Sequence, residues 1–228
     1  ADKYGFTRAE QDSFSVASVE RAQAAIASGA FKEEIVPVTV AGRKGEVTHA
    51  TDEQPGKSDV AKIPTLKPAF RKENGTVTAA SSSGISDGAA ATVVMSADEA
   101  FKRGIQPLAR IIAHATLAQE PEWFTTAPVG AIQSVLAKAG WSVESVDLFE
   151  INEAFAVVAM APIRDLGIPH AKVNVNGGAC ALGHPIGASG ARILNTLLFE
   201  MQRRDAKKGL ATLCIGGGMG VALCVARD

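Results

Sequence analysis

The sequence has few cysteines, no long apolar run and no excess of charge of either sign. Three cysteines in 228 residues cannot form a disulfide framework, and their odd number suits a reducing compartment. No apolar stretch reaches the roughly 18 residues that a membrane-spanning helix needs. The 23 basic and 24 acidic side chains nearly cancel, which excludes binding to nucleic acid or to a membrane surface through bulk positive charge. The mixed, charged opening from Ala1 to Arg8 has no signal-peptide pattern, so we expect a cytoplasmic protein, or a mitochondrial one in a eukaryote.

Glycine is plentiful, and it is concentrated in one region. Ten of the 22 glycines fall between Gly177 and Gly220. A glycine density of this kind indicates unusual backbone angles or close approach of the backbone to a ligand. We therefore expect the chemistry of the protein to lie in this part of the chain.

The first 75 residues begin with a clear helix and continue with a weakly patterned segment. Thr7 and Glu10 have the spacing of a capping box, which predicts a helix that ends near Gly29. Residues 35–40 are predicted to form an edge strand because they contain a proline. Residues 41–75 are rich in turn formers and in basic side chains (Arg43, Lys44, Lys57, Lys62, Lys67, Arg71 and Lys72), which suits either a solvated loop or a lid over an anionic ligand.

The remainder of the chain alternates helices with strands. Strands are predicted at 91–96, 108–115, 146–151, 173–175, 211–215 and 220–225, and the apolar character of 91–96 predicts a buried strand. Helical patterns lie between them at 97–103, 128–139, 153–166 and 185–204. This alternation predicts an α/β fold with a mixed, mostly parallel sheet and helices on both faces. The last two strands form an antiparallel hairpin across Gly216–Gly218.

Asn152 to Phe155 is the first of three segments that resemble chemical sites, and it lies where a predicted strand gives way to a helix. Ligands of open α/β sheets collect outside the carboxyl ends of strands. Asn152 suits two roles there. It can cap the following helix, or its carboxamide can hold a water or a substrate oxygen.

The second segment, Asn176 to Gly190, places His184 directly before Pro185. Proline is favoured as the first residue of a helix, and the positive end of a helix dipole would keep the His184 ring neutral and able to act as a base. A structural histidine is the alternative. The glycine-dense surroundings favour catalysis.

The third segment is Cys214 to Gly220, in which a cysteine precedes three glycines. Such glycines let backbone N–H groups face a ligand and form an oxyanion hole. Cys224, in the last predicted strand, resembles an ordinary buried cysteine. A dinucleotide site is excluded because no helix follows Gly220, and a zinc site is excluded because the chain has no paired Cys-x-x-Cys.

The order and spacing of three motifs resemble the thiolase family: 152–155, 183–185 and 214–218. The likeness covers essentially the whole chain and is closest to the acetyl-CoA acetyltransferases. It implies a thiolase-like α/β fold with part of a loop (lid) domain. Residues 1–104 would hold the lid region and the end of the N-terminal thiolase half, and residues 105–228 the C-terminal thiolase domain.

The resemblance also implies a reaction, in which two acetyl-CoA molecules condense to acetoacetyl-CoA and thiolysis reverses the step. His184 would activate a nucleophilic cysteine and help to hold the thioester oxygen, while Asn152 would hold a water that completes this first oxyanion hole. Cys214 would be the general base that removes the α-proton of acetyl-CoA. The N–H of Gly216 would belong to a second oxyanion hole.

Coenzyme A contacts are implied at Ser83, Ala79 and Lys57. Ser83 matches a serine that contacts the pantetheine arm, although the run Ser81–Gly84 differs from the usual Asn-Ala-Ser-Gly. Lys57 is the candidate for the basic residue that meets the CoA nucleotide. Residues 121–124 resemble the mitochondrial-type members rather than many biosynthetic ones. The substrates would be CoA thioesters without a further cofactor or metal, and the full-length protein would be a homodimer or homotetramer.

One expected group of the family is missing. Its nucleophilic cysteine has no equivalent here, since Cys180 lies in the His184 loop. The chain therefore resembles the C-terminal portion of a thiolase, and we expect it to be inactive alone. The alternatives are a non-catalytic module that binds acyl-CoA or a partner, and a relative with other condensation chemistry such as a ketoacyl synthase. Cys214 argues against both, because neither needs a thiol base.

Overall fold

A computed structural model describes residues 1–43 and 45–228. The described residues form two compact units. Unit 1 comprises Ala1–Ile85, Glu153–Val157 and Asn176–His184, and unit 2 comprises Ser86–Asn152, Val158–Val175 and Pro185–Asp228. None of the helices in the described part of the chain combines the length and the apolar character needed to cross a membrane.

Unit 1 is built on the long helix α1 (Arg8–Ser28). The predicted capping box is confirmed, because the Thr7 hydroxyl accepts the Glu10 N–H and the Glu10 carboxylate accepts the Thr7 N–H. Gly29 ends the helix with a φ of 76°, as predicted. The buried face of α1 packs on the 3-10 helix η2 (Val60–Thr65) and on the short helix α6 (Ala179–Leu182), where Val19, Ala22, Ile63 and Ala181 form an apolar cluster.

The weakly patterned segment of unit 1 contains more regular structure than the sequence indicated. Strands β1 (Val38–Gly42) and β2 (Gly45–His49) pair in an antiparallel hairpin, and the residues of both strands are exposed. The strand predicted at 35–40 is thus shifted toward the C-terminus and gains an unforeseen partner. Helix α2 (Glu53–Lys57) and η2 follow, and a short 3-10 helix, η1 (Asp2–Tyr4), opens the chain. Lys44, one of the basic residues counted above, lies outside the described residues.

Unit 2 is a four-stranded sheet in the order β3-β6-β5-β4. Its strands are β3 (Arg110–Ala118), β4 (Leu148–Ile151), β5 (Lys208–Ile215) and β6 (Met219–Ala226), which confirms four of the predicted strands. The sheet is mixed, as predicted. The expected majority of parallel pairs is corrected, because only β4 and β5 run parallel, and β6 is antiparallel to both of its neighbours.

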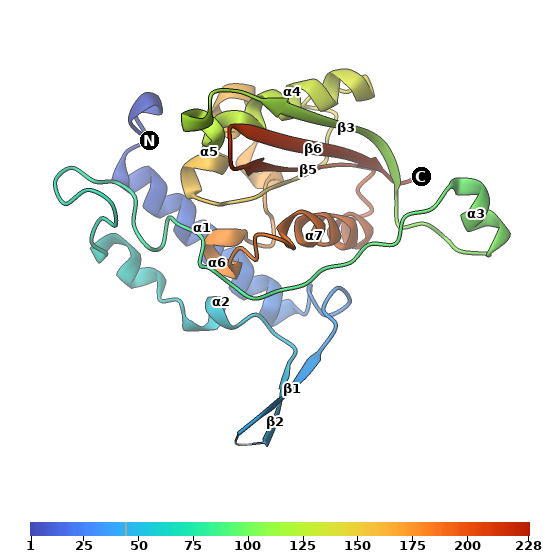
Figure 1. The fold of residues 1–228 in the computed structure, drawn as a ribbon, viewed down its shortest axis with the longest axis horizontal. Coiled ribbons are helices and arrows are strands. Elements are labelled where there is room, and N and C mark those ends of the chain that lie inside the picture. The colour runs from blue at the N-terminus through green and yellow to red at the C-terminus, as the bar shows by residue number, and fades with distance from the viewer. Residues whose placement is uncertain (44) are drawn as a thin grey trace. The chain divides into compact units, whose positions relative to one another are not determined.

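Helices cover both faces of this sheet, as predicted (Figure 1). Helix α7 (Ser189–Arg204) packs through Ile193, Leu197 and Met201 on one face, against Leu148, Ala211 and Val225. Helix α4 (Ala127–Ala139) covers the other face so closely that Gly220 and Gly130 leave no room for a Cβ atom. Side chains alternate along a strand, so Cys214, which pairs with Gly220, lies on the α4 face.

Shorter elements complete unit 2. They are α3 (Ala97–Lys102), the 3-10 helices η3 (Pro121–Thr126) and η4 (His170–Lys172), and most of α5 (Ala156–Leu166), whose first two residues belong to unit 1. The strand predicted at 173–175 is reduced to an isolated bridge between Val173 and Phe149.

The buried strand predicted at 91–96 is wrong. These residues adopt no regular structure, and the side chains of Val93 and Val94 are 83% and 69% exposed. A strand needs a neighbour for its backbone hydrogen bonds. The bonds that the structure gives this run join Thr92 and the Ala91 carbonyl to the Asn195 side chain, and Ser96 to the helix α3 that follows it.

Candidate active site

The predicted site residues divide between the two units. Unit 1 contains His184 and the proposed CoA contacts, Ser83, Ala79 and Lys57. Unit 2 contains Asn152, Cys214 and Gly216. Each set is described within its own unit.

His184 ends a loop that is fixed by backbone bonds in unit 1. Its N–H donates to the Gly84 carbonyl over 2.9 Å, and it forms a bridge with Ile85. Gly183, with a φ of 90°, turns the chain out of α6. The sequence placed His184 at the start of a long helix, but α7 begins only at Ser189. A helix dipole acts mainly within the first turn of a helix, so the effect of this dipole on His184 that the sequence predicted is wrong.

Cys180, in the same loop, is partly buried and lies next to Glu153. Burial, and then the neighbouring Glu153 carboxylate, raise the pKa of the Cys180 thiol well above its usual value. The thiolate is the nucleophilic form of cysteine, and this thiol keeps its proton at neutral pH. The surroundings of Cys180 therefore make it a poor nucleophile.

The three proposed CoA contacts differ from one another in solvent exposure and in their bonding partners. The N–H and the hydroxyl of Ser83 both donate to the Ala154 carbonyl, over 3.1 and 3.0 Å. This fixes Ser83 beside the motif that begins at Asn152, and its hydroxyl oxygen keeps acceptor capacity. Ala79 is exposed. Lys57 is also exposed, and its ammonium lies 2.6 Å from the Glu53 carboxylate, so it is already paired.

In unit 2, Asn152 and Cys214 lie at the carboxyl ends of two adjacent parallel strands. Ile151 on β4 is in register with Thr212 on β5, and the N–H of Asn152 donates to the Thr212 carbonyl over 3.0 Å. Asn152 is 1% exposed and Cys214 is 8% exposed. Burial raises the pKa of the Cys214 thiol to about 11. A sheet edge of this kind is where ligands of α/β folds collect.

The three glycines after Cys214 form the turn between β5 and β6. Gly217 and Gly218 have φ values of 87° and 90°, which side chains rarely adopt. The N–H of Gln119 donates to the Gly218 carbonyl over 2.9 Å, and a Cβ at Gly218 would collide with the Gln119 carbonyl. Gly216 is exposed, with open space around its Cα. No local sequence pattern points to Gln119, and only the run of glycines indicated such a close approach of the backbone.

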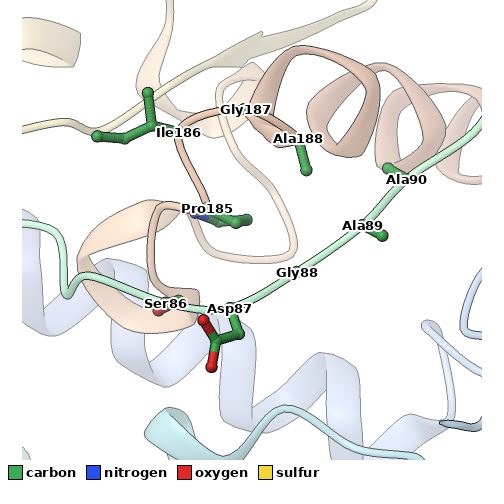
Figure 2. A pocket seen from close by; sticks show the side chains of 9 residues that line it. All are labelled: Ser86, Asp87, Gly88, Ala89, Ala90, Pro185, Ile186, Gly187 and Ala188. Carbon is green, nitrogen blue, oxygen red and sulfur yellow. The ribbon is translucent and has the colours of Figure 1, made fainter.

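Unit 2 also contains an open cavity of about 410 Å³ that is separate from these groups (Figure 2). The extended segment Ser86–Ala90 runs along one side and the turn Pro185–Ala188 along the other. Asp87 is its only charged side chain, and none of the predicted site residues lines it. Within the described residues, no group of three or more histidine, cysteine, aspartate or glutamate side chains could hold a metal ion.

Comparison with known proteins agrees with the sequence motifs. Residues 1–98 match the N-terminal domain of thiolases, and residues 105–227 match the C-terminal domain of thiolases. The chain belongs to the thiolase family. Among curated thiolase relatives it is 58% identical over 228 residues to "Acetyl-CoA acetyltransferase" of Paracoccus denitrificans, and 56% identical over 226 residues to the protein of the same name from Shinella zoogloeoides.

Solved thiolase structures give the same result for the fold. The chain is similar to the Bacillus anthracis acetyl-CoA acetyltransferase, with a TM-score of 0.96 and 46% identity over 99% of its length. It is also similar to human mitochondrial 3-ketoacyl-CoA thiolase, with a TM-score of 0.92 and 38% identity over its whole length. The predicted thiolase-like fold is confirmed. All of this chain is covered in the Paracoccus comparison and 99% in the Shinella one, yet it spans only 58% and 57% of those two relatives. It spans 57% and 58% of the two solved chains.

Proposed function

We propose that this chain is part of an acetyl-CoA C-acetyltransferase, which condenses two acetyl-CoA molecules to acetoacetyl-CoA and catalyses the reverse thiolysis. The observation that carries the proposal is the pair formed by Asn152 and Cys214 at one sheet edge, next to the Gly216–Gly218 turn. Such a site offers a titratable group and backbone donors together. The names of the relatives support acetyl-CoA as the substrate class.

In the condensation step, Cys214 acts as the base. Its thiolate takes an α-proton from acetyl-CoA, and the electron pair of the broken C–H bond forms an enolate with negative charge on the thioester oxygen. His184 and a water held by Asn152 stabilise that oxygen by hydrogen bonding. The enolate carbon then attacks the carbonyl carbon of an acetyl group carried as a thioester by a nucleophilic cysteine, and the Gly216 N–H stabilises the second oxyanion. When this intermediate collapses, its C–S bond to the cysteine breaks, the cysteine leaves as a thiolate and acetoacetyl-CoA is released.

The high pKa of Cys214 favours thiolysis but hinders the condensation reaction. In thiolysis the group must donate a proton to the departing enolate carbon, and a thiol whose pKa is about 11 carries that proton at neutral pH. In condensation the thiol must first lose its proton. We therefore expect α-proton exchange of acetyl-CoA to accelerate as the pH rises from neutrality.

The nucleophile is expected outside this chain. Burial raises the pKa values of Cys214 and Cys224 to about 11 and 12, and the pKa of Cys180 also lies well above its usual value. In each case burial disfavours the thiolate, which is the nucleophilic form of cysteine, and this supports a nucleophile outside the chain. We propose that the 228-residue chain alone has no thiolase activity.

The remaining parts of the proposal concern ligand contacts and assembly. Ser83 and Ala79 contact the pantetheine arm, and Lys57 meets the nucleotide after leaving Glu53, which costs little free energy because exposed ion pairs are weak. The division into residues 1–104 and 105–228, the assembly of the full-length protein as a homodimer or homotetramer and the cytoplasmic location stay predictions.

A fusion protein tests the function. The part of the Paracoccus denitrificans relative that this chain does not cover is joined to the chain to give a protein of the relative's length, called here the chimera. We expect the chimera to cleave acetoacetyl-CoA with free CoA, and the 228-residue chain to show no cleavage. A chimera that binds acetoacetyl-CoA without cleaving it would favour a non-catalytic binding module. Cleavage by the 228-residue chain alone would refute the assignment of the nucleophile to the missing part.

A further inference from the structure

Glu153 is a buried carboxylate in unit 1 that the reaction outlined above does not use. Its residue is 1% exposed, and burial of a charge is costly unless hydrogen bonds compensate it. One of its oxygens, Oε2, accepts the Ser18 hydroxyl over 2.7 Å and the Cys180 N–H over 3.0 Å. Glu153 thus joins helix α1 to the loop that ends at His184.

Ser18 completes the connection from the other side. While its hydroxyl donates to Glu153, its oxygen accepts the Gly178 N–H over 2.9 Å. Ser18 is 3% exposed, so these bonds are shielded from water. The two side chains together hold two N–H groups of the loop, those of Gly178 and Cys180. We call this arrangement the Ser18–Glu153 clamp.

The glycines of the loop are what allow such close contact. A Cβ at Gly178 would collide with the carboxyl group of Glu153. A Cβ at Gly177, whose φ is 81°, would meet the backbone of Ser18 and Ala22 at 2.5–2.9 Å. The density of glycine in this loop therefore reflects contact with α1 and Glu153, and the loop backbone lies directly on its clamp.

The segment between the clamp and His184 is held in place by further contacts. Helix α6 follows Gly178, and its Ala181 is fully buried in the apolar cluster of α1 and η2. His184 is then bonded through its N–H to Gly84. Ser83, the residue before Gly84, is bonded to Ala154, the residue after Glu153. The loop is thus fixed at both ends to the segment that begins at Glu153.

We infer that Glu153 and Ser18 are positioning residues that hold the imidazole of His184 in its catalytic place through the clamp. The catalytic role that this inference gives to His184 rests on the proposed function. Neither residue touches the substrate in this assignment. Displacement of a catalytic group by about 1 Å reduces rates roughly 100-fold, so loss of the clamp is expected to reduce kcat.

The helix supplies a matched control for the test. Ser15 is also buried in α1, but its hydroxyl donates to the Gln11 carbonyl of the same helix and does not bond to the loop. Ser18→Ala and Ser15→Ala each remove one buried hydroxyl from α1. Only the first removes a bond to the loop and leaves the Gly178 N–H without its acceptor.

Kinetics of the chimera give the first measurement. We expect Ser18→Ala to lower kcat for thiolysis about 10-fold or more with little change in KM, because a displaced His184 weakens transition-state contacts more than substrate binding. Ser15→Ala should keep kcat within about 3-fold even if its Tm falls equally. Glu153→Ala should behave as Ser18→Ala does, and Glu153→Gln, which keeps an oxygen acceptor, should restore most of kcat. Equal kcat values for the two serine variants would overturn the inference.

A measurement without catalysis separates this inference from the proposed function. The reaction of His184 with diethyl pyrocarbonate is followed by peptide mass spectrometry in the 228-residue chain and in the chimera. We expect Ser18→Ala to change the modification rate of His184 and its pH dependence, while Ser15→Ala leaves both unchanged. Identical behaviour of the two variants overturns the clamp even in an active chimera. An inactive chimera with altered His184 modification would refute the proposed function and keep the clamp.

Discussion

The two glycine-rich segments that carry the proposed catalytic groups are held in different ways. In unit 1, the loop 176–184 is held by buried side chains, since Ser18 and Glu153 accept its N–H groups. In unit 2, the turn 216–218 is held by main chain, through the hairpin of β5 and β6 and the bond from the Gln119 N–H to Gly218. The first segment should therefore be sensitive to distant side-chain deletions, and the second mainly to changes of its own backbone.

This difference suits the groups that the segments present. The loop presents an imidazole, whose position depends on how the chain enters and leaves His184. The turn presents a backbone N–H at Gly216 and follows a side chain, Cys214, that is already fixed within a strand. A strand with partners on both sides, such as β5, positions its side chains without additional polar contacts.

The largest expected effects come from removal of the two proposed catalytic side chains, one in each unit. In the chimera, His184→Asn and Cys214→Ser should each lower thiolysis about 100- to 10,000-fold, the range for loss of a general acid or base. Deuterium exchange at the α-carbon of acetyl-CoA sharpens the comparison. Cys214→Ser should block this exchange more than it slows acylation of the enzyme. Exchange at the wild-type rate in Cys214→Ser would show that Cys214 is not the base.

The next effect concerns the backbone of the turn. Gly218→Ala should lower the free energy of unfolding by about 2–4 kcal/mol, because it places a side chain at a φ of 90° and against the Gln119 carbonyl. Gly216→Ala is the control, since no heavy atom lies within 4 Å of its added Cβ. We expect the control to stay within about 0.5 kcal/mol of wild type. Denaturant unfolding of the 228-residue chain provides the measurement, and similar losses for both variants would contradict a backbone-held turn.

Alkaline pH should loosen the hairpin that forms this turn. Burial raises the pKa of Cys224, in β6, to about 12, whereas an unfolded thiol ionises near pH 8.5. The neutral thiol is favoured in the folded state, so its contribution to stability is complete below the unfolded pKa and declines as the pH rises toward the folded pKa. The expected loss is about 2–3 kcal/mol by pH 10.5. Cys224→Ser cannot ionise there, and its stability should fall less between pH 8 and about 10.5. Parallel pH curves for the two proteins would exclude this thiol as the cause.

The sequence predicted the hairpin and its sheet better than it predicted the segment 91–96. Residues 211–215 and 91–96 are both largely apolar, and the sequence predicts a strand for each. Only the first is a strand, because it has β4 and β6 on its two sides. Apolar character indicates a tendency to be buried, but it does not identify the partner. Local signals were more reliable, since the capping box at Thr7 and the helix end at Gly29 depend only on nearby residues.

The candidate site was predicted through its motifs, and its supporting contacts were not. Cys214, Asn152 and His184 stand next to glycines or at strand ends, where residue type and position already suggest chemistry. Ser18 lies 135 residues from Glu153, and no local pattern connects them. The prediction of the start of α7 is also wrong, since Pro185 predicts the first helical residue whereas the chain makes one further turn before Ser189.

The smallest expected effect is the one that most directly tests the comparison of the two segments. The side-chain amide of Gln119 donates to the Thr126 hydroxyl over 2.7 Å and to the Trp123 carbonyl, while its backbone N–H holds Gly218. Gln119→Ala removes the side-chain bonds only, so it should cost about 1 kcal/mol of stability and change kcat of the chimera less than about 3-fold. Ser18→Ala, a deletion of similar size on the other segment, should reduce kcat about 10-fold or more. Comparable kcat losses for these two variants would mean that the turn, like the loop, depends on side chains, and the distinction between the two segments would fail.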